Sequence, residues 1–167
     1  QMGGRLSGEH RPGVARVVVI GDAPGAGVTI VQTSAGLNGA LRDGAAHCAS
    51  RWPDDGVAAL VGDLPALRSE ELGAALEAAA AHASAFVADA SGAGTTLLTA
   101  APGTELDPRF GLGSAARHKE IAAPLDGGDG LRCDIDTAAD LRAAARVGLG
   151  PATRAALGAD WMRPSSL

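Results

Sequence analysis

The stretch "GVAALVGDLPALRSEELGAALEAAAAHA", residues 56–83, reads as a strand, a loop and a helix in direct succession. Val57–Val61 is a short apolar run of the kind that forms a buried strand. Gly62 and Pro65 mark its end, because glycine and proline interrupt regular structure. From Ser69 onward, leucines and alanines recur at three- and four-residue spacing, which predicts an amphipathic helix. A strand that leads through a loop into a helix is the repeating unit of an α/β fold.

Similar strand and helix patterns occur on both sides of this stretch. The expected strands are 14–20, 28–32, 57–61, 85–89, 95–100 and 131–136, and the expected helices begin near Gly36, Ser69, Gly113, Thr137 and Pro151. The strands are apolar throughout rather than alternating, which indicates a mostly parallel sheet covered by helices on both faces. Ligands bind such sheets beyond the carboxyl ends of the strands, so the loops after the strands are the places to search for chemistry.

The composition excludes several functional classes. The 167 residues suit one domain, expected over 14–160 between a poorly ordered 1–13 and a tail at 161–167, and 46% of them are hydrophobic. A net charge of −5 and a single lysine, Lys119, argue against nucleic-acid binding. No apolar run approaches the roughly 20 residues that span a bilayer, and no signal peptide is visible. Cys48 and Cys133 lack metal-ligand spacing, so free thiols in a reducing cytoplasm are expected.

Three aspartates follow expected strands. Asp63 comes directly after the strand at 57–61, and Asp134 and Asp136 end the one at 131–136. On an extended chain, residues two apart point to the same side, so both of these carboxylates would face one point. Left alone they would repel each other, and a divalent cation removes that penalty. Mg²⁺ is commonly held by one or two carboxylates together with phosphate oxygens.

These aspartates could instead have purely structural roles. Asp63 could be a turn residue that hydrogen-bonds its own backbone. Asp136 or Thr137 could cap the following helix, with Thr137 and Asp140 forming a capping-box pair. That alternative leaves Asp134 without a role.

Three glycine-containing loops could bind anions or a nucleoside. The amides of Gly92–Thr96 could converge on an anion, or the loop could be a plain hairpin turn. Gly111 and Gly113 precede Ser114 at an expected helix start, where either a phosphate or an ordinary serine cap would fit. In the stretch 34–41, Asn38 could hydrogen-bond to a sugar or a base, or it could be a turn residue. We expect Arg117 and His118 to lie on the surface.

Taken together, six stretches in this order resemble a known family: "GLNGAL", "ALVGDLPALRSEEL", "FVADASGAGTTLLTA", "DPRFGLGSAARH", "LRCDIDTAADL" and "GLGPATR". They resemble the phosphoenolpyruvate/2-phospho-L-lactate guanylyltransferases of coenzyme F-420 biosynthesis, over roughly 14–157. The resemblance implies a nucleotidyltransferase fold, that is, a glycosyltransferase-A-like, Rossmann-like three-layer α/β sandwich. It also implies transfer of GMP from GTP to phosphoenolpyruvate or 2-phospho-L-lactate, with release of pyrophosphate.

The resemblance also implies roles for individual residues. Asp63, Asp134 and Asp136 would be the catalytic residues and would hold Mg²⁺, and Thr95, Gly111 and Ser114 would bind the acceptor, largely through backbone N–H groups. The residues implied on the nucleotide side are Gly36, Leu37, Asn38, Gly39 and Gly62.

The start of the chain departs from the family pattern. Members begin with an earlier strand and a loop rich in lysine and arginine that holds the triphosphate, whereas here thirteen residues without lysine precede Val14. We expect that the first strand is missing because the chain is a fragment, or else that the protein is a degenerate relative. In either case we expect low activity from these residues alone, and an unpaired sheet edge would favour association into a homodimer.

Other functions fit the same residues. Another nucleotidyltransferase of this fold could act on a molybdopterin or a sugar phosphate. A non-catalytic module could bind Mg²⁺ and a phospho-acid without transfer. A plain α/β domain would use all its aspartates as caps and turns.

Overall fold

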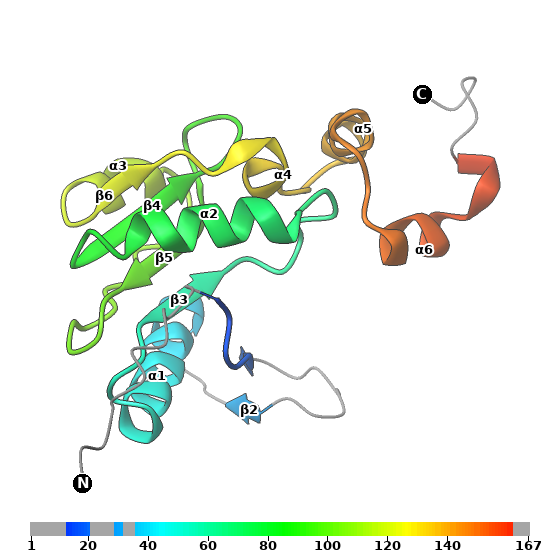
Figure 1. The fold of residues 1–167 in the computed structure, drawn as a ribbon. Helices are drawn as coiled ribbons and strands as arrows, with labels where there is room; N and C mark the ends of the chain where they lie inside the picture. Colours follow the sequence, from blue (N-terminus) through cyan, green and yellow to red (C-terminus); the bar gives the residue numbers. More distant parts are fainter. Residues whose placement is uncertain (1–12, 21–28, 32–35, 162–167) are drawn as a thin grey trace, which may run out of the picture.

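The main sheet has four strands, and helices cover both of its faces (Figure 1). The computed structural model describes residues 13–20, 29–31 and 36–161. The strand order is β3-β5-β4-β6. These strands are β3 (Val57–Leu60), β5 (Thr95–Ala100), β4 (Ser84–Ala88) and β6 (Ala123–Leu125). Two further strands, β1 (Val18–Ile20) and β2 (Thr29–Val31), pair in parallel as a separate sheet.

The four-stranded sheet is mixed, so the expectation of a mostly parallel sheet is wrong for it. β5 runs antiparallel to both β3 and β4, and only β4 and β6 are parallel. Residues 89–94 join β4 directly to β5, and so short a connection can only link antiparallel neighbours. Helices on both faces bury these strands regardless of their direction, and for that reason their apolar sequences resemble those of a parallel sheet.

The two faces of the sheet carry different helices. Helix α1 (Gly36–Arg51) and helix α3 (Ser114–Lys119) contribute to the core cluster on one face. Helix α2 (Ser69–Ala79) and helix α4 (Gly128–Arg132) contribute to the cluster on the other. The α/β prediction and the helices near Gly36, Ser69 and Gly113 are thereby confirmed.

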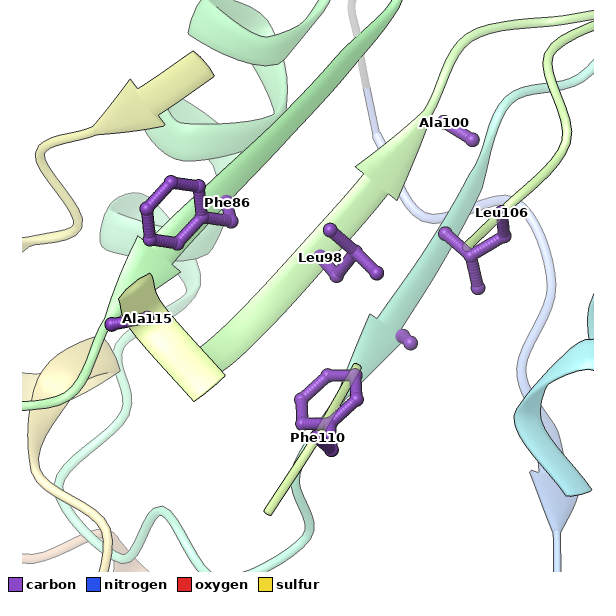
Figure 2. Packing of buried hydrophobic residues seen from close by; sticks show 7 residues of the cluster. Phe86, Leu98, Ala100, Leu106, Phe110 and Ala115 are labelled. Carbon is purple, nitrogen blue, oxygen red and sulfur yellow. The ribbon is translucent and has the colours of Figure 1, made fainter. Parts of the chain in front are cut away.

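The first core cluster contains both phenylalanines of the chain (Figure 2). Phe86 on β4 and Leu98 on β5 pack with Phe110, which lies on the connection between β5 and α3. Because Phe110 is buried, it anchors the segment that leads to Ser114 against the sheet. The core therefore fixes one of the loops expected to bind the acceptor.

The expected strand at 131–136 is wrong. Gly128–Arg132 forms α4, and the residues from Cys133 to Asp136 form no strand. Gly130 explains the short helix, because its N–H donates to Glu71 Oε1 of α2 at 3.1 Å and a β-carbon there would overlap both Glu71 and a backbone carbonyl. Close packing against α2 therefore accompanies a helical turn in a segment where the sequence predicted a strand. Strand β6 was not expected either.

Two last helices follow. Helix α5 (Ala138–Val147) begins after Thr137, and helix α6 (Pro151–Trp161) begins at the expected proline. Both pack in a third cluster, which includes Ala66 and Cys133. Among the described helices, none is long and apolar enough to cross a bilayer. The expectations for 1–12 and 162–167 lie outside the described residues.

Candidate active site

Three carboxylates act on the carboxyl group of Asp134, which directly follows α4 and Cys133. Burial raises the pKa of the Asp134 carboxyl, and the negative charges of Asp89, Asp63 and Asp136 raise it further, partly opposed by its own backbone N–H. Asp63 reaches this place from the loop after β3, and Asp89 from the end of β4. The structure therefore places Asp63 and Asp136 within electrostatic reach of Asp134 and adds Asp89, which sequence reasoning missed.

The negative charge of this cluster is not balanced by the described residues. Within the described part of the chain, no arginine, lysine or histidine forms an ion pair with Asp63, Asp134 or Asp136. Uncompensated carboxylates of this kind favour a cation, and oxygen donors suit Mg²⁺ in particular. The donor chemistry fits the predicted metal.

The predicted metal site is nevertheless not assembled in the structure. In the described residues, no three histidine, cysteine, aspartate or glutamate side chains are gathered closely enough to hold a metal ion. Mg²⁺ binding by Asp63, Asp134 and Asp136 therefore stays a prediction.

The capping alternative accounts for Thr137 and Asp140, and it involves Asp136 only through its backbone N–H, which donates to Asp140 Oδ2 at 3.2 Å. Asp140 Oδ2 accepts from the Thr137 backbone N–H at 2.8 Å and from the Thr137 hydroxyl at 2.7 Å, while Thr137 Oγ1 accepts from the Asp140 N–H at 3.3 Å. This capping box starts α5, and hydrogen bonding to Thr137 lowers the pKa of the Asp140 carboxyl. The carboxylates of Asp134 and Asp136 take no part in it, so they remain available for a ligand.

Arg132 ties the segment that carries Asp134 to the end of β4. Its guanidinium donates to the carbonyl oxygen of Ala88 at 3.2 Å and to that of Asp89 at 2.9 Å. The Ala90 N–H donates back to the Arg132 carbonyl at 2.7 Å. Three hydrogen bonds therefore fix the distance between Asp89 and the residues that directly follow α4. The position of one arginine in the sequence gave no signal for this role.

The glycine loop between β4 and β5 is closed on an internal carboxylate. Asp89 Oδ1 accepts from the Ala93 N–H at 3.1 Å, and Asp89 Oδ2 accepts from the Gly94 N–H at 2.8 Å. A β-carbon at Gly94 would overlap Asp89 Oδ2, so a larger residue there would displace the carboxylate from the amides of the turn. The amides expected to face an anionic ligand thus bind the anion that the chain itself supplies. The hairpin alternative for this loop is confirmed.

Beside this hairpin, Thr95 and Ser114 meet in the core. Thr95 begins β5 and Ser114 begins α3, and their hydroxyl oxygens lie 3.2 Å apart. Thr95 Oγ1 is also 2.8 Å from His118 Nδ1, and His118 Nε2 accepts from the Arg109 N–H at 2.9 Å. All three side chains are buried. The structure thus joins two of the predicted acceptor residues and adds His118.

The expectation that Arg117 and His118 lie on the surface is wrong. His118 is fully buried, and its ring packs against Phe86 and Phe110. Arg117 is half-buried and donates to the carbonyl oxygens of Arg109, at 2.9 and 3.2 Å, and of Leu112, at 2.7 Å. These bonds shape the loop that contains Gly111, whose φ of +118° favours glycine.

Asn38 connects the start of α1 to the same loop. Its amide nitrogen donates to the Phe110 carbonyl at 3.1 Å, and its amide oxygen accepts from the Phe110 N–H at 2.8 Å. Both polar groups of Asn38 are therefore occupied by the backbone. Gly36, Leu37 and Gly39 lie in the first turn of α1, and Leu37 is exposed.

The remaining predicted residue, Gly62, lies exposed between β3 and Asp63, with no atom within 4 Å of where its β-carbon would be.

The hairpin at 89–94 lies between the two groups of predicted residues. Its Asp89 acts on Asp134, and its Ala93 carbonyl accepts from the Ala115 N–H at 3.0 Å, next to Ser114. The acidic cluster and the hydroxyl pair therefore flank one short turn.

Proteins of known activity are similar to this chain over most of its length, although no family model matches it. It is 48% identical over 156 residues to a phosphoenolpyruvate guanylyltransferase of Streptomyces coelicolor, which covers 86% of this chain and 74% of that protein. The enzyme of the same name from Thermomonospora curvata is 49% identical over 156 residues, covering 85% of this chain and 68% of that protein. That of Streptomyces avermitilis is 52% identical over 137 residues, covering 80% and 63%.

Proposed function

Because the chain belongs to the phosphoenolpyruvate guanylyltransferase family, we propose that it transfers GMP from GTP to phosphoenolpyruvate. In this reaction, a phosphate oxygen of phosphoenolpyruvate attacks the α-phosphorus of GTP, and the bond to the β-phosphate breaks to release pyrophosphate. The observation that carries the proposal is the identity of nearly half of the aligned residues with relatives of that name. The product would serve the coenzyme F-420 pathway.

The acidic cluster is the part of the site that we assign to metal binding. Asp63, Asp134 and Asp136 would hold Mg²⁺, which supplies neutralisation of the phosphate charges and orientation of the attacking oxygen. The raised pKa of Asp134 is caused first by burial and then by the negative charges of Asp89, Asp63 and Asp136, and it supports this role because a bound cation offsets both effects. Arg132 holds Asp134 in reach of the end of β4 and thereby keeps the carboxylates together.

The loop and hydroxyl pair on the other side of the hairpin are assigned to the acceptor. Thr95, Gly111 and Ser114 would contact its carboxylate and phosphate. Gly111 lies on a loop that Arg117 holds through two carbonyl oxygens, so its N–H group is positioned before substrate arrives. Preorganised donors of this kind cost little reorganisation when charge develops.

The start of α1 and the loop after β3 are assigned to the nucleotide. Gly36, Leu37, Asn38, Gly39 and Gly62 would line that side. Since the Asn38 amide is occupied by Phe110, its contribution would be to link the nucleotide side to the acceptor loop. Exposed backbone at Gly62 would allow close approach of a phosphate or sugar.

An acceptor and donor screen tests this proposal. Pyrophosphate release is measured with GTP, ATP, CTP and UTP, each with phosphoenolpyruvate, 2-phospho-L-lactate or a sugar phosphate, with and without Mg²⁺. We expect release that requires GTP, phosphoenolpyruvate and Mg²⁺ together, and a product with the mass of the guanylylated acceptor. Faster release with a different acceptor or nucleotide would refute the assignment.

A further inference from the structure

The carbonyl and N–H groups of the acceptor loop, residues 109–113, are used differently. The N–H groups of residues 111, 112 and 113 have no hydrogen-bond acceptor among the described residues. The carbonyl oxygens of residues 109–112 all accept hydrogen bonds, in chain order from Arg117, from Asn38, from the Ser114 N–H and again from Arg117. The direction in which the N–H groups point therefore depends on the residues that hold these carbonyls.

Asn38 is the residue that holds the peptide group between Phe110 and Gly111. Its amide oxygen accepts from the Phe110 N–H at 2.8 Å, and its amide nitrogen donates to the Phe110 carbonyl at 3.1 Å. A backbone N–H can only donate, so the amide oxygen must face it and the amide nitrogen must face the carbonyl. The bonds from Arg117 reach the carbonyls of Arg109 and Leu112 and leave this peptide group untouched.

The hold on the Phe110 carbonyl also sets the direction of the Gly111 N–H. These two groups belong to one planar peptide unit, and none of the described peptide bonds is cis. In a trans peptide the C=O and the N–H point in opposite directions. Because the Phe110 carbonyl points toward Asn38, the Gly111 N–H points away from that side chain.

Without Asn38, little else would fix this peptide group. Gly111 has a φ of +118°, and the lack of a β-carbon lets a glycine accept either direction of the peptide that precedes it. Leu112, the next residue, is 98% exposed, so its side chain gives the loop no apolar anchor. The buried ring of Phe110 fixes the position of that residue in the core, but it does not prevent rotation of the peptide that follows.

We propose that Asn38 is a positioning residue that orients the peptide between Phe110 and Gly111, so that the Gly111 N–H faces the acceptor substrate. The proposal rests on the proposed function, in which Gly111 contacts phosphoenolpyruvate. It gives Asn38 a role in binding of the acceptor, although the residue lies on the helix that we assign to the nucleotide. Both polar groups of its amide are occupied by Phe110, so the nucleotide does not use them.

Arg42 provides a matched comparison on the same helix. It lies one turn after Asn38, and its guanidinium donates to the Pro108 carbonyl at 3.3 Å and pairs with Asp107 at 3.4 Å. The side chains of this ion pair are about half exposed, and such pairs contribute little to stability. Arg42 therefore ties the neighbouring segment to α1 without contacting the peptide that carries the Gly111 N–H.

Steady-state kinetics of pyrophosphate release separates the two roles of α1. We expect Asn38→Ala to raise KM for phosphoenolpyruvate about tenfold while KM for GTP stays unchanged, because one correctly placed donor is lost. Arg42→Gln, and Ser50→Ala in the last turn of α1, should leave both KM values unchanged. KM does not depend on the fraction of the protein that is folded, so a loss of stability alone cannot produce this pattern.

Two kinetic outcomes would overturn the proposal. If Asn38→Ala raises KM for GTP and not KM for phosphoenolpyruvate, Asn38 contacts the nucleotide. If Arg42→Gln raises KM for phosphoenolpyruvate as much as Asn38→Ala does, general anchoring of the loop to α1 matters, and the direction of one peptide does not.

Crystal structures of the unaltered protein and of Asn38→Asp test the orientation without any activity. The new carboxylate can still accept from the Phe110 N–H, but it cannot donate to the Phe110 carbonyl and would repel it. We expect the peptide to turn over in this variant, with the Gly111 N–H directed toward the carboxylate. An unchanged peptide would overturn the proposal. If the unaltered protein neither binds phosphoenolpyruvate nor reacts with it, the proposed function fails together with the acceptor contact, whereas the two crystal structures still decide whether Asn38 orients the peptide.

Discussion

Mild acid should destabilise the fold through His118. The side chain is fully buried, and burial lowers its pKa from the usual 6.5 to about 4, with further lowering by Arg117 and Arg109. The folded protein therefore binds a proton at this site far more weakly than the unfolded chain does. Protonation would also place an N–H group of the ring against the N–H of Arg109.

The sign and size follow from the two pKa values. Above pH 6.5 the ring is neutral in both states, and its full contribution to stability is present. Below that value the unfolded chain takes up the proton first, so stability falls as the pH falls toward 4. A difference of one in pKa corresponds to about 1.4 kcal/mol, so the whole effect is about 3 kcal/mol. Of this, about 2.5 kcal/mol should be lost between pH 7.5 and pH 4.5.

Urea unfolding at several pH values measures the loss. Other groups also titrate in this range, so the free energy of unfolding is compared with that of His118→Gln, which keeps an acceptor for the Arg109 N–H and cannot titrate. We expect the unaltered protein to lose about 2.5 kcal/mol more than this variant between pH 7.5 and pH 4.5. His82→Gln, at an exposed turn after α2, serves as the surface control. Parallel curves for the unaltered protein and His118→Gln would refute the reasoning.

Three further substitutions test the other parts of the site, and a fourth, on α2, serves as a control. Asp134→Asn should lower the rate of pyrophosphate release at least about 100-fold and weaken Mg²⁺ binding. Its stability in urea should not fall, because the substitution removes a carboxylate that neighbouring carboxylates repel. Arg132→Lys cannot reproduce both bonds to the end of β4, so urea unfolding should show a loss of about 1–3 kcal/mol. Gly94→Ala should lower the melting temperature, because the added β-carbon would overlap Asp89. Gly73→Ala, at an open position on α2, should instead stabilise the folded protein by about 0.5–1 kcal/mol.

Local patterns identified most of the helices and strands correctly. α2 and α5 follow from three- and four-residue spacing and from the Thr137–Asp140 capping box, which are properties of neighbouring residues. Strand direction depends instead on which elements cover the sheet and on how the chain turns. β5 is apolar and buried because helices lie on both faces, so its sequence resembles that of a parallel strand although it is antiparallel to both neighbours.

The segment around α4 shows a second limit of prediction from local sequence patterns. Leu131 and Cys133 are buried and alternate with less buried residues, as they would on a strand. The short helix forms instead because Gly130 lies against Glu71 of α2, a contact between residues far apart in the sequence. No local pattern encodes such a contact, and the same holds for Arg132 and the end of β4.

Some residues of the candidate site could be predicted from local sequence, and others depend on contacts between distant parts of the chain. Asp63 is visible in the sequence as an aspartate that follows a strand, whereas Asp134 was chosen as the end of a strand that does not form. Thr95 and Ser114 were chosen from the resemblance to a known family. His118 could not be predicted from the sequence, because a histidine near the end of a short helix, among charged neighbours, is usually exposed. Its hydrogen bonding depends on which backbone N–H faces its Nε2, and only the folded loop places Arg109 there.

The hairpin at 89–94 connects the acidic cluster to the hydroxyl pair of the candidate site. Asp89 closes the turn through the amides of Ala93 and Gly94, and the same turn then delivers Thr95 to Ser114 and the Ala93 carbonyl to α3. On its other side, Arg132 binds the backbone of the turn and fixes the segment that carries Asp134. A shift of this turn would move carboxylates and hydroxyls together, and an enzyme that joins two phosphates needs the relative position of those groups to be constant. The carboxylate that closes this turn belongs to the chain itself, so the positions of Thr95 and of the Ala93 carbonyl do not depend on a bound substrate.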